Sequence, residues 1–193
     1  MKRLALMAAA LCVFLMPSVA RAQDHVEVGG FADYFRLHDT GTNFAGLGGR
    51  VGVGIFRSVQ LEAEMNYDFE QTYANFQTVN GSGVVVASPA NVSILHGLFG
   101  PKIQTHGPVK LFATIKGGFI NFRFNNNGAN SAGFVNQVNG LNRNDVDAAV
   151  YPGGGVEAFF GPLGFRAEVG DEIYFNNGGH NNWRATFGPT IRF

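Results

Sequence analysis

The sequence predicts an all-β protein, folded as an eight-stranded antiparallel up-and-down β-barrel. Two observations support this prediction. Apolar and polar residues alternate with a period of two in eight segments, and the connections between these segments are short and long in turn. A period of two puts successive side chains on opposite faces of a strand, so each segment has one apolar and one polar face. Phenylalanine, a good strand former, contributes 19 of the 193 residues.

The first 22 residues are typical of a removable export signal and not of a folded element. Lys2 and Arg3 form a basic start, an apolar run extends from residue 4 to residue 16, and Ala20 and Ala22 form an A-x-A cleavage site. A transmembrane anchor would need roughly 20 apolar residues, and this run is shorter. We therefore expect cleavage after Ala22 and a barrel domain over residues 23–193.

Without the signal, the composition argues against several classes of protein. Residues 23–193 carry 11 Lys and Arg against 14 Asp and Glu, and these charges are scattered along the chain. We therefore expect no nucleic-acid partner. No run of 18 apolar residues remains, which argues against a helical membrane protein. The single cysteine, Cys12, lies within the signal, so the mature chain is expected to have no disulfide.

The clearest strand is predicted over Val59–Glu70, where every odd position is apolar and every even position is polar. A helix would spread the acidic residues around its circumference, whereas a strand collects them on one face. Seven other segments show the same alternation with less contrast: Val26–Leu37, Ala45–Arg57, Val92–Gln104, Val109–Phe122, Val146–Phe160, Gly164–Phe175 and Trp183–Phe193. Eight is an even number, as a closed antiparallel barrel with both termini on one side requires.

The connections between the predicted strands sort by length. Short joints are expected at residues 57–58, 105–108 and 161–162, and longer ones at residues 38–44, 71–91, 124–145 and 176–182. Short turns at one rim and long loops at the other are typical of transmembrane β-barrels, whereas a soluble β-sandwich has no reason to sort its loops in this way. The sorting therefore favours a transmembrane barrel with both termini at the short-turn end.

The last predicted strand ends on an aromatic residue. Such an ending resembles the recognition signal that an assembly machinery reads on the final strand of bacterial outer-membrane β-barrels, and the resemblance assigns this signal to Phe187, Ile191 and Phe193. Together with the export signal and the alternation of Val59–Glu70, it makes the chain similar to the eight-stranded OmpA-type outer-membrane barrel family. The resemblance implies a place in the bacterial outer membrane, contact with its lipid and insertion by the barrel-assembly machinery. A peptidoglycan-binding domain is not expected after the last strand.

Aromatic residues are predicted to form a girdle at each membrane interface. The girdle near the long loops would contain Tyr34, Tyr67, Phe69, Tyr174, Phe175 and Trp183, and the girdle near the short turns Phe56, Phe159, Phe160, Phe165 and Phe193.

If the apolar faces meet lipid, the polar faces fill the lumen. An eight-stranded barrel is just wide enough for side chains to fill its interior, so we expect a plug of paired charges. Its members would be Arg50, Glu62, Glu64, Lys116, Glu157, Arg166, Glu168, Glu172, Arg184 and Arg192, with His96 on the same face. Counting residues from the short turns places Arg50 opposite Glu64 and Glu157 opposite Arg166. Glycines on the same inward face, such as Gly48, Gly155 and Gly170, would either make room for the long charged side chains or leave wet pockets.

The motifs that suggest enzyme chemistry are weak. Residues 153–158 match a G-x-G-x-x-A dinucleotide fingerprint, but Phe159, Phe160 and Pro162 follow and no helix can form there. The five histidines lack the spacing of a zinc site. We therefore expect no catalytic site, no cofactor and no metal.

The long loops are the candidates for contact with a surface ligand. The loop over residues 125–144 is rich in asparagine and glycine, as solvated segments are, whereas Asn80-Gly81 is typical of a hairpin turn that would extend the third and fourth strands beyond the membrane. The main hypothesis is a monomeric outer-membrane barrel with a structural or surface-interaction role through these loops. Two alternatives stay open: a narrow pore for water, ions or small solutes, and a soluble lipocalin-like barrel with its apolar face inside.

Overall fold

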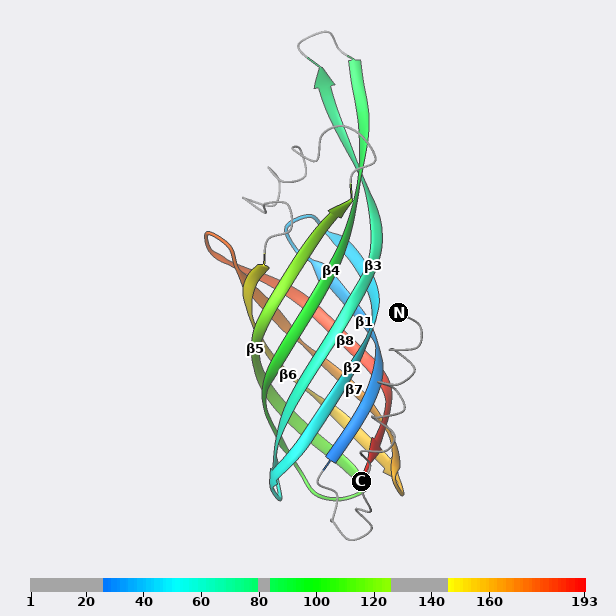
Figure 1. Ribbon diagram of the computed structural model, residues 1–193, viewed down its shortest axis with the longest axis vertical. Helices are drawn as coiled ribbons and strands as arrows, with labels where there is room; N and C mark the ends of the chain where they lie inside the picture. The colour runs from blue at the N-terminus through cyan, green and yellow to red at the C-terminus, as the bar shows by residue number, and fades with distance from the viewer. Residues whose placement is uncertain (1–25, 80–83, 126–145) are drawn as a thin grey trace, which may run out of the picture.

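The computed structural model describes residues 26–79, 84–125 and 146–193, with side chains over residues 26–71, 91–123 and 146–193. Its strands are β1 (Val26–Leu37), β2 (Thr42–Phe56), β3 (Val59–Val79), β4 (Val84–Gln104), β5 (Val109–Asn125), β6 (Val146–Phe160), β7 (Leu163–Phe175) and β8 (Gly179–Arg192). Each strand pairs antiparallel with its neighbours in sequence, and β8 pairs with β1, which closes the barrel (Figure 1). The predicted fold class is confirmed.

The closing seam brings the ends of the described barrel together. Phe193 donates its backbone N–H to the carbonyl of Val26 at 2.9 Å, and Val26 donates to the carbonyl of Phe193 at 3.4 Å. Both ends lie at the rim that carries the short turns (Figure 1). Within the barrel wall each strand therefore has a partner on each side, whereas β3 beyond Asp68 and β4 before Asn91 pair only with each other among the described residues.

The strands on the long-loop side are longer than predicted. β3 and β4 continue as a hairpin from the pair Gln71 and Val92 to the pair Val79 and Val84. This hairpin was predicted, although its turn, Asn80-Gly81, lies outside the described residues. β2 and β8 begin earlier than predicted, so the prediction of long connections at residues 38–44 and 176–182 was wrong. The loops span residues 38–41 and 176–178 and are no longer than the connection at residues 105–108 on the opposite rim. Polar residues extend these strands because ladder hydrogen bonds come from the backbone and not from apolar side chains.

Two other predictions also lie outside the described residues. These are the export signal with its cleavage site at Ala20 and Ala22, and all but the first residue of the loop over 125–144. Within the described ranges, no helix has the length and apolar character needed to cross a membrane.

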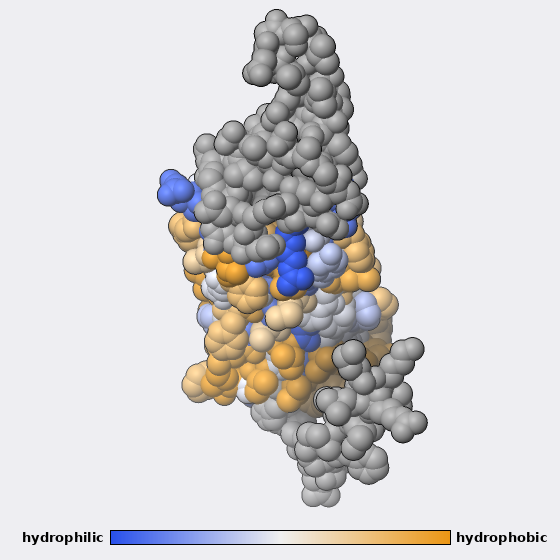
Figure 2. Space-filling model, turned by 45° about the horizontal axis from the view of Figure 1, so that its top comes forward, coloured by the Kyte–Doolittle hydropathy of each residue, from blue (hydrophilic) through white to orange (hydrophobic). Residues whose placement is uncertain are grey.

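The alternation places apolar side chains outside and polar ones inside. Leu47, Leu111 and Phe187 are 60%, 63% and 59% exposed, whereas the lumenal Glu62, Lys116 and Arg184 are at most 1% exposed. Figure 2 shows apolar residues gathered over the wall of the barrel. A soluble lipocalin-like barrel would have the opposite orientation, so that alternative is wrong for the described side chains.

Most predicted girdle residues do face outward, with two exceptions. Tyr174 is fully buried and stacks on His180, and Phe159 is 4% exposed beneath Lys110 and Arg192. Both residues stand at inward positions of their strands, in step with Glu172 on β7 and Glu157 on β6. Their assignment to the girdles was wrong because it rested on position along the strand and not on the parity of the alternation.

Candidate functional site: the filled lumen

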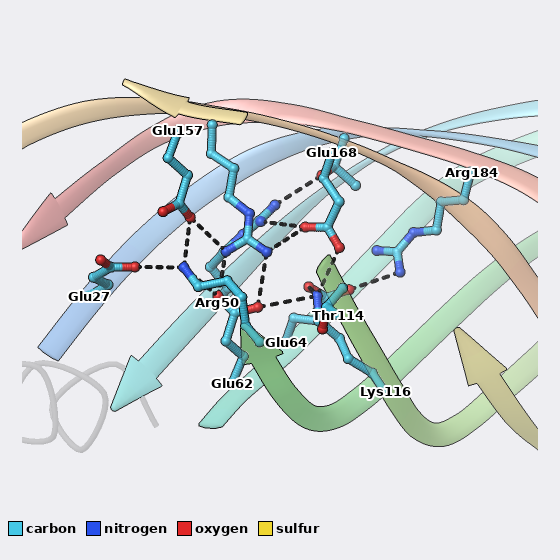
Figure 3. Close-up of polar contacts among 12 residues, drawn as sticks. Glu27, Arg50, Glu62, Glu64, Thr114, Lys116, Glu157, Glu168 and Arg184 are labelled. Atoms are coloured by element: carbon cyan, nitrogen blue, oxygen red, sulfur yellow. Dashed lines mark hydrogen bonds and ion pairs between the residues drawn. The ribbon is translucent and has the colours of Figure 1, made fainter. Parts of the chain in front are cut away.

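The lumen is filled by charged side chains that converge from all eight strands. Asp33 comes from β1 and Lys102 from β4, and Figure 3 shows others, such as Glu27 of β1 and Arg184 of β8, pointing toward one another. Successive residues of a strand alternate between its faces, so each strand contributes one inward side chain every second residue. The predicted members Arg50, Glu62, Glu64, Lys116, Glu157, Arg166, Glu168, Glu172 and Arg184 all lie in this interior and all are at most 7% exposed.

The part of the network nearest the short turns centres on Lys102 of β4. Its Nζ lies 2.9 Å from Glu27 Oε2, 2.8 Å from Glu157 Oε1 and 3.3 Å from Glu62 Oε1. Neither Lys102 nor Glu27 was among the residues predicted for the network. Both occupy inward-facing positions of the alternation in their strands, so a strict count of every second residue would have identified them.

Arg166 of β7 joins this part of the network to the middle of the barrel. Its guanidinium forms ion pairs with Glu62, with Glu157 at 3.0 Å and with Glu168 at 2.6 Å. The predicted register of Glu157 opposite Arg166 is confirmed, and here the two facing side chains also form an ion pair. The Arg166 guanidinium thus neutralises part of the charge of three carboxylates, which come from three different strands.

The middle of the network corrects the prediction for Arg50. Its backbone does stand opposite Glu64, but its guanidinium reaches across the lumen to Glu168 at 2.9 Å and donates to Thr186 Oγ1 at 3.0 Å. Glu64 instead binds Lys116 at 2.7 Å. In a narrow barrel the far wall is within reach of a long side chain, so the nearest neighbour in the ladder is not always the partner.

Arg184 of β8 organises the next part of the network. Its Nε lies 3.0 Å and 3.1 Å from the two carboxylate oxygens of Asp33, and its Nη1 lies 2.9 Å from Glu64 Oε1 and 3.3 Å from Glu172 Oε2. Its Nη2 donates to the side-chain oxygen of Asn66 at 2.8 Å. Each of its three nitrogens donates to at least one acceptor, in a site with no solvent exposure.

His96 of β4 lies between two carboxylates. Its Nδ1 is 2.6 Å from Glu172 Oε1 and its Nε2 is 3.0 Å from Asp68 Oδ2. An imidazole that donates from both nitrogens carries a positive charge. His96 therefore acts as a further cation of the network.

Asp33, Asp68 and His96 also have donor atoms within 4.8 Å of one another, the spacing of a metal site. A metal-binding histidine needs a nitrogen lone pair that faces the ion. Both nitrogens of His96 face carboxylates instead, and Asp33 binds Arg184. The donor set therefore fits a charge network better than a metal.

Aromatic rings on the inner wall of the barrel contact several of the cations. The guanidinium carbon of Arg50 lies 4.3 Å from the ring centre of Phe31, and that of Arg166 lies 4.1 Å from the ring centre of Phe112. A Cβ at Gly48 would overlap the Phe31 ring, and one at Gly155 would meet both the backbone carbonyl of Ala167 and the Phe112 ring. The inward glycines thus make room for rings, and cation–π contacts supplement the ion pairs.

An apolar plug, which the sequence analysis did not predict, occupies the lumen toward the long loops. Its core residues are Phe35, Leu37, Phe44, Val92, Ile94, Leu98, Ile120, Phe122, Ala149, Tyr151 and Tyr174, each at most 3% exposed. They stand at inward positions that continue the charged rows of the same strands. The lumen is therefore filled by paired charges over part of its length and by apolar side chains beyond them.

The remaining predicted site residues lie at the short-turn rim or on the outer wall. Arg192 contacts the ring of Phe159 at 4.5 Å and donates through Nε to the carbonyl of Gly161, so it lies below the buried network. Phe187, Ile191 and Phe193 are 59%, 40% and 45% exposed on the outer face near the end of the chain.

A second cluster connects two loops at the opposite rim. His180 Nδ1 lies 2.6 Å from Asp39 Oδ2, and its Nε2 lies 3.1 Å from the carbonyl of Asn176. Because both nitrogens are engaged, neither is positioned to take a proton from a nucleophile. This cluster fixes the two loops to each other.

No family model matches the sequence, and no curated protein matches it by sequence. Among solved structures, the chain is similar to Neisserial surface protein A, with a TM-score of 0.54 and 9% identity over 88% of this chain and 96% of that one. It is also similar to Ail, the attachment invasion locus protein of Yersinia pestis, solved with the heparin analogue sucrose octasulfate, with a TM-score of 0.50 and 12% identity over 88% and 97% of the two chains. At these identities the likeness concerns the fold. The chain thus has the fold of the eight-stranded outer-membrane β-barrels, as its sequence resemblance predicted.

Proposed function

We propose that this protein is a monomeric, non-conducting barrel of the bacterial outer membrane that presents its β3–β4 hairpin to partners at the cell surface. The observation that carries this proposal is the filled lumen. The charged residues of the lumenal network form ion pairs with one another, and the apolar plug lies between them and the long loops. No catalytic role is proposed.

The outer wall supports a membrane location. Leu47, Met65 and Phe99 are 60%, 56% and 57% exposed on the outside of neighbouring strands. In water this surface would favour aggregation, whereas in a bilayer it contacts lipid. The closed ladder of a single chain leaves no edge in the barrel wall for a second copy to pair with.

The rims support an orientation. Transmembrane barrels place short turns in the periplasm and longer loops outside the cell. Among the described connections, the β3–β4 hairpin is the long one, and the rule applied to it places Phe193 and the turns at residues 57–58 and 161–162 in the periplasm. Phe187, Ile191 and Phe193 would then be presented on the outer face of β8 to the assembly machinery.

The β3–β4 hairpin is the part of the described structure best placed to meet a partner. The described pairing of β2 with β3 ends at Asp68, and β5 pairs with β4 up to Asn91, so the hairpin beyond these points has no third strand among the described residues. It rises above the barrel wall in Figure 1. Unpaired strand edges are common sites of protein–protein contact.

A truncated chain tests the role of this hairpin. Residues 72–90 are replaced by Asn-Gly, which leaves the pairs of β3 and β4 within the barrel wall in place. Bacteria that display the truncated chain at the same surface level are expected to adhere several-fold less to epithelial cells than bacteria with the full chain. A heat-modifiable gel shift confirms that both barrels fold. Equal adhesion would contradict the surface-interaction role.

The narrow pore is tested separately. Purified barrel in a planar bilayer is expected to show no stable unit conductance steps, because the lumen is filled by side chains with little solvent exposure. Reproducible steps from the folded protein would favour the pore.

A further inference from the structure

A cavity of about 680 Å³ opens at the short-turn rim of the barrel, away from the hairpin. It lies between the β2–β3 turn and the β4–β5 turn. A backbone hydrogen bond of 2.8 Å, from the Gln104 N–H to the Ser58 carbonyl, joins the two turns. Lys110, near the start of β5, and Arg192, at the end of β8, also contribute to its wall. We call it the rim cavity.

The rim cavity is lined by basic groups. Arg57 lies on the β2–β3 turn, His106 on the β4–β5 turn, and Lys110 and Arg192 face inward, while no carboxylate is among the lining residues. The nearest acidic group of the network, Glu27, contacts Lys110 at 3.2 Å and Lys102 at 2.9 Å. The cavity itself therefore presents a net positive charge.

Two buried acceptors also line the rim cavity. Gln60 and Gln104 are 2% and 8% exposed, and the side-chain Oε1 of each has no hydrogen-bond partner in the part of the chain that the structure describes. Leaving a buried acceptor unpaired is costly, so such atoms are uncommon in folded proteins. A bound molecule with an N–H or O–H group would satisfy them.

We propose that the rim cavity binds a phosphate ester that also carries an ammonium or hydroxyl group. Arg57, Lys110 and Arg192 are suited to the phosphate, since guanidinium and ammonium groups form strong charge-assisted hydrogen bonds with phosphate oxygens. Gln60 and Gln104 accept hydrogen bonds from the second group. Phosphoethanolamine has this combination of groups.

Two sources of this ligand are compatible with the site. Ile55 and Phe56 line the same cavity and are 50% and 72% exposed toward the outer face of the barrel, so a phospholipid of the inner leaflet could place its headgroup in the cavity. A free phosphate ester could enter from the periplasm instead.

The test uses ¹⁵N-labelled protein refolded in detergent micelles without phosphate. Phosphoethanolamine is expected to shift the side-chain amide signals of Gln60 and Gln104 and the Nε signals of Arg57 and Arg192 in a saturable way. Ethanolamine and sodium chloride at matched ionic strength are expected to have no such effect. Shifts that do not saturate, or that ethanolamine reproduces, would overturn the proposal.

Variants show whether the assigned groups act. Arg57→Gln and, separately, Lys110→Gln are expected to weaken binding about tenfold or more, as the loss of a charge-assisted contact does. Arg57 is exposed on a turn, so its variant does not disturb the buried network. Arg36→Gln, at an exposed arginine near the opposite rim, is the matched control and is expected to leave binding unchanged. Undiminished binding in both rim-cavity variants would contradict the assignment.

Nanodiscs distinguish the two sources. If the lipid headgroup is the ligand, phosphatidylethanolamine nanodiscs alone will shift the Gln60 and Gln104 signals to their ligand-bound positions, and phosphatidylcholine nanodiscs will not. If the ligand is a free ester, the signals will be the same in both lipids and will still respond to added phosphoethanolamine. Signals that respond in neither case would overturn the proposal.

Discussion

Replacing Arg184 by methionine tests the buried charge network at a cation that one carboxylate, Asp33, cannot replace with another ion-pair partner among the described residues. The guanidinium has no solvent exposure and binds Asp33, Glu64, Glu172 and Asn66. Methionine fills a similar volume but carries no charge. The variant therefore removes one cation from the lumen with little change in packing.

The expected loss follows from the cations that remain. Counting each hydrogen bond to a charged group at about 1.5 kcal/mol or more would give at least about 7.5 kcal/mol for the five bonds, which overstates the net effect. Glu64 keeps Lys116 at 2.7 Å and Glu172 keeps His96 at 2.6 Å, whereas Asp33 keeps no other ion pair among the described residues. One uncompensated buried carboxylate lowers the free energy of unfolding by about 3–5 kcal/mol.

The assay is reversible urea unfolding in lipid vesicles, followed by circular dichroism and by the fluorescence of Trp183. Asp33→Asn is combined with Arg184→Met in a double-mutant cycle, because the asparagine removes the charge that the arginine compensates. We expect the double variant to be more stable than the sum of the single losses predicts, by about 1.5 kcal/mol or more. Losses that add within about 0.5 kcal/mol would refute the reasoning.

Arg192→Met is the matched control, since the side-chain change is the same. Arg192 lies at the rim, where its Nε donates to the Gly161 carbonyl and its guanidinium contacts Phe159. A rim position close to water is screened, so we expect a loss below about 1 kcal/mol. If Arg192→Met lowers the free energy of unfolding as much as Arg184→Met does, burial does not determine how strongly these charges stabilise the barrel.

Three further predictions follow from the same geometry. Removing Glu157 and Arg166 in a double-mutant cycle should give a weaker coupling than Asp33 with Arg184, because Glu157 also has a lysine at 2.8 Å; an equal or larger coupling in urea unfolding would contradict this. Gly188→Ala should prevent or slow barrel formation in a heat-modifiable gel assay, because the new Cβ would overlap the β1 backbone, whereas Gly117→Ala, which has open space around it, should fold like wild type. Val51→Arg on the outer face should lower vesicle-embedded stability by about 2–4 kcal/mol if the residue meets the bilayer midplane, and no loss would argue against lipid contact there.

The fold was predictable because one rule, alternation, applies to every strand. Val59–Glu70 gave the clearest pattern, and the observed register of Arg50 with Glu64 and of Glu157 with Arg166 agrees with counting from tight turns. A tight turn limits the possible registers, and the bulge between Gly54 and Phe56 shifts the β2–β3 register by only one residue. A strict count of every second residue along β4, starting from His96, would also have placed Lys102 inside.

The partners across the lumen were not predictable. Arg50 binds Glu168 on the far wall because the side chains of a narrow barrel reach across it, and turn counting relates only adjacent strands. The apolar plug was missed for a different reason. Phe35 and Ile94 are apolar at inward positions, and the expectation of a polar interior gave no reason to look for them there.

The central claim is that the apolar face of this barrel meets lipid while the charges face a filled lumen. The most direct test is site-directed spin labelling in vesicles, since residues 23–193 contain no cysteine. Labels at Leu47, Val51 and Val53 on the outer face of β2 are expected to be reached by dissolved oxygen and not by a water-soluble nickel chelate, whereas a label at Ser58 in the short turn is expected to be reached by the chelate. Access of the chelate to all three β2 positions would contradict the claim.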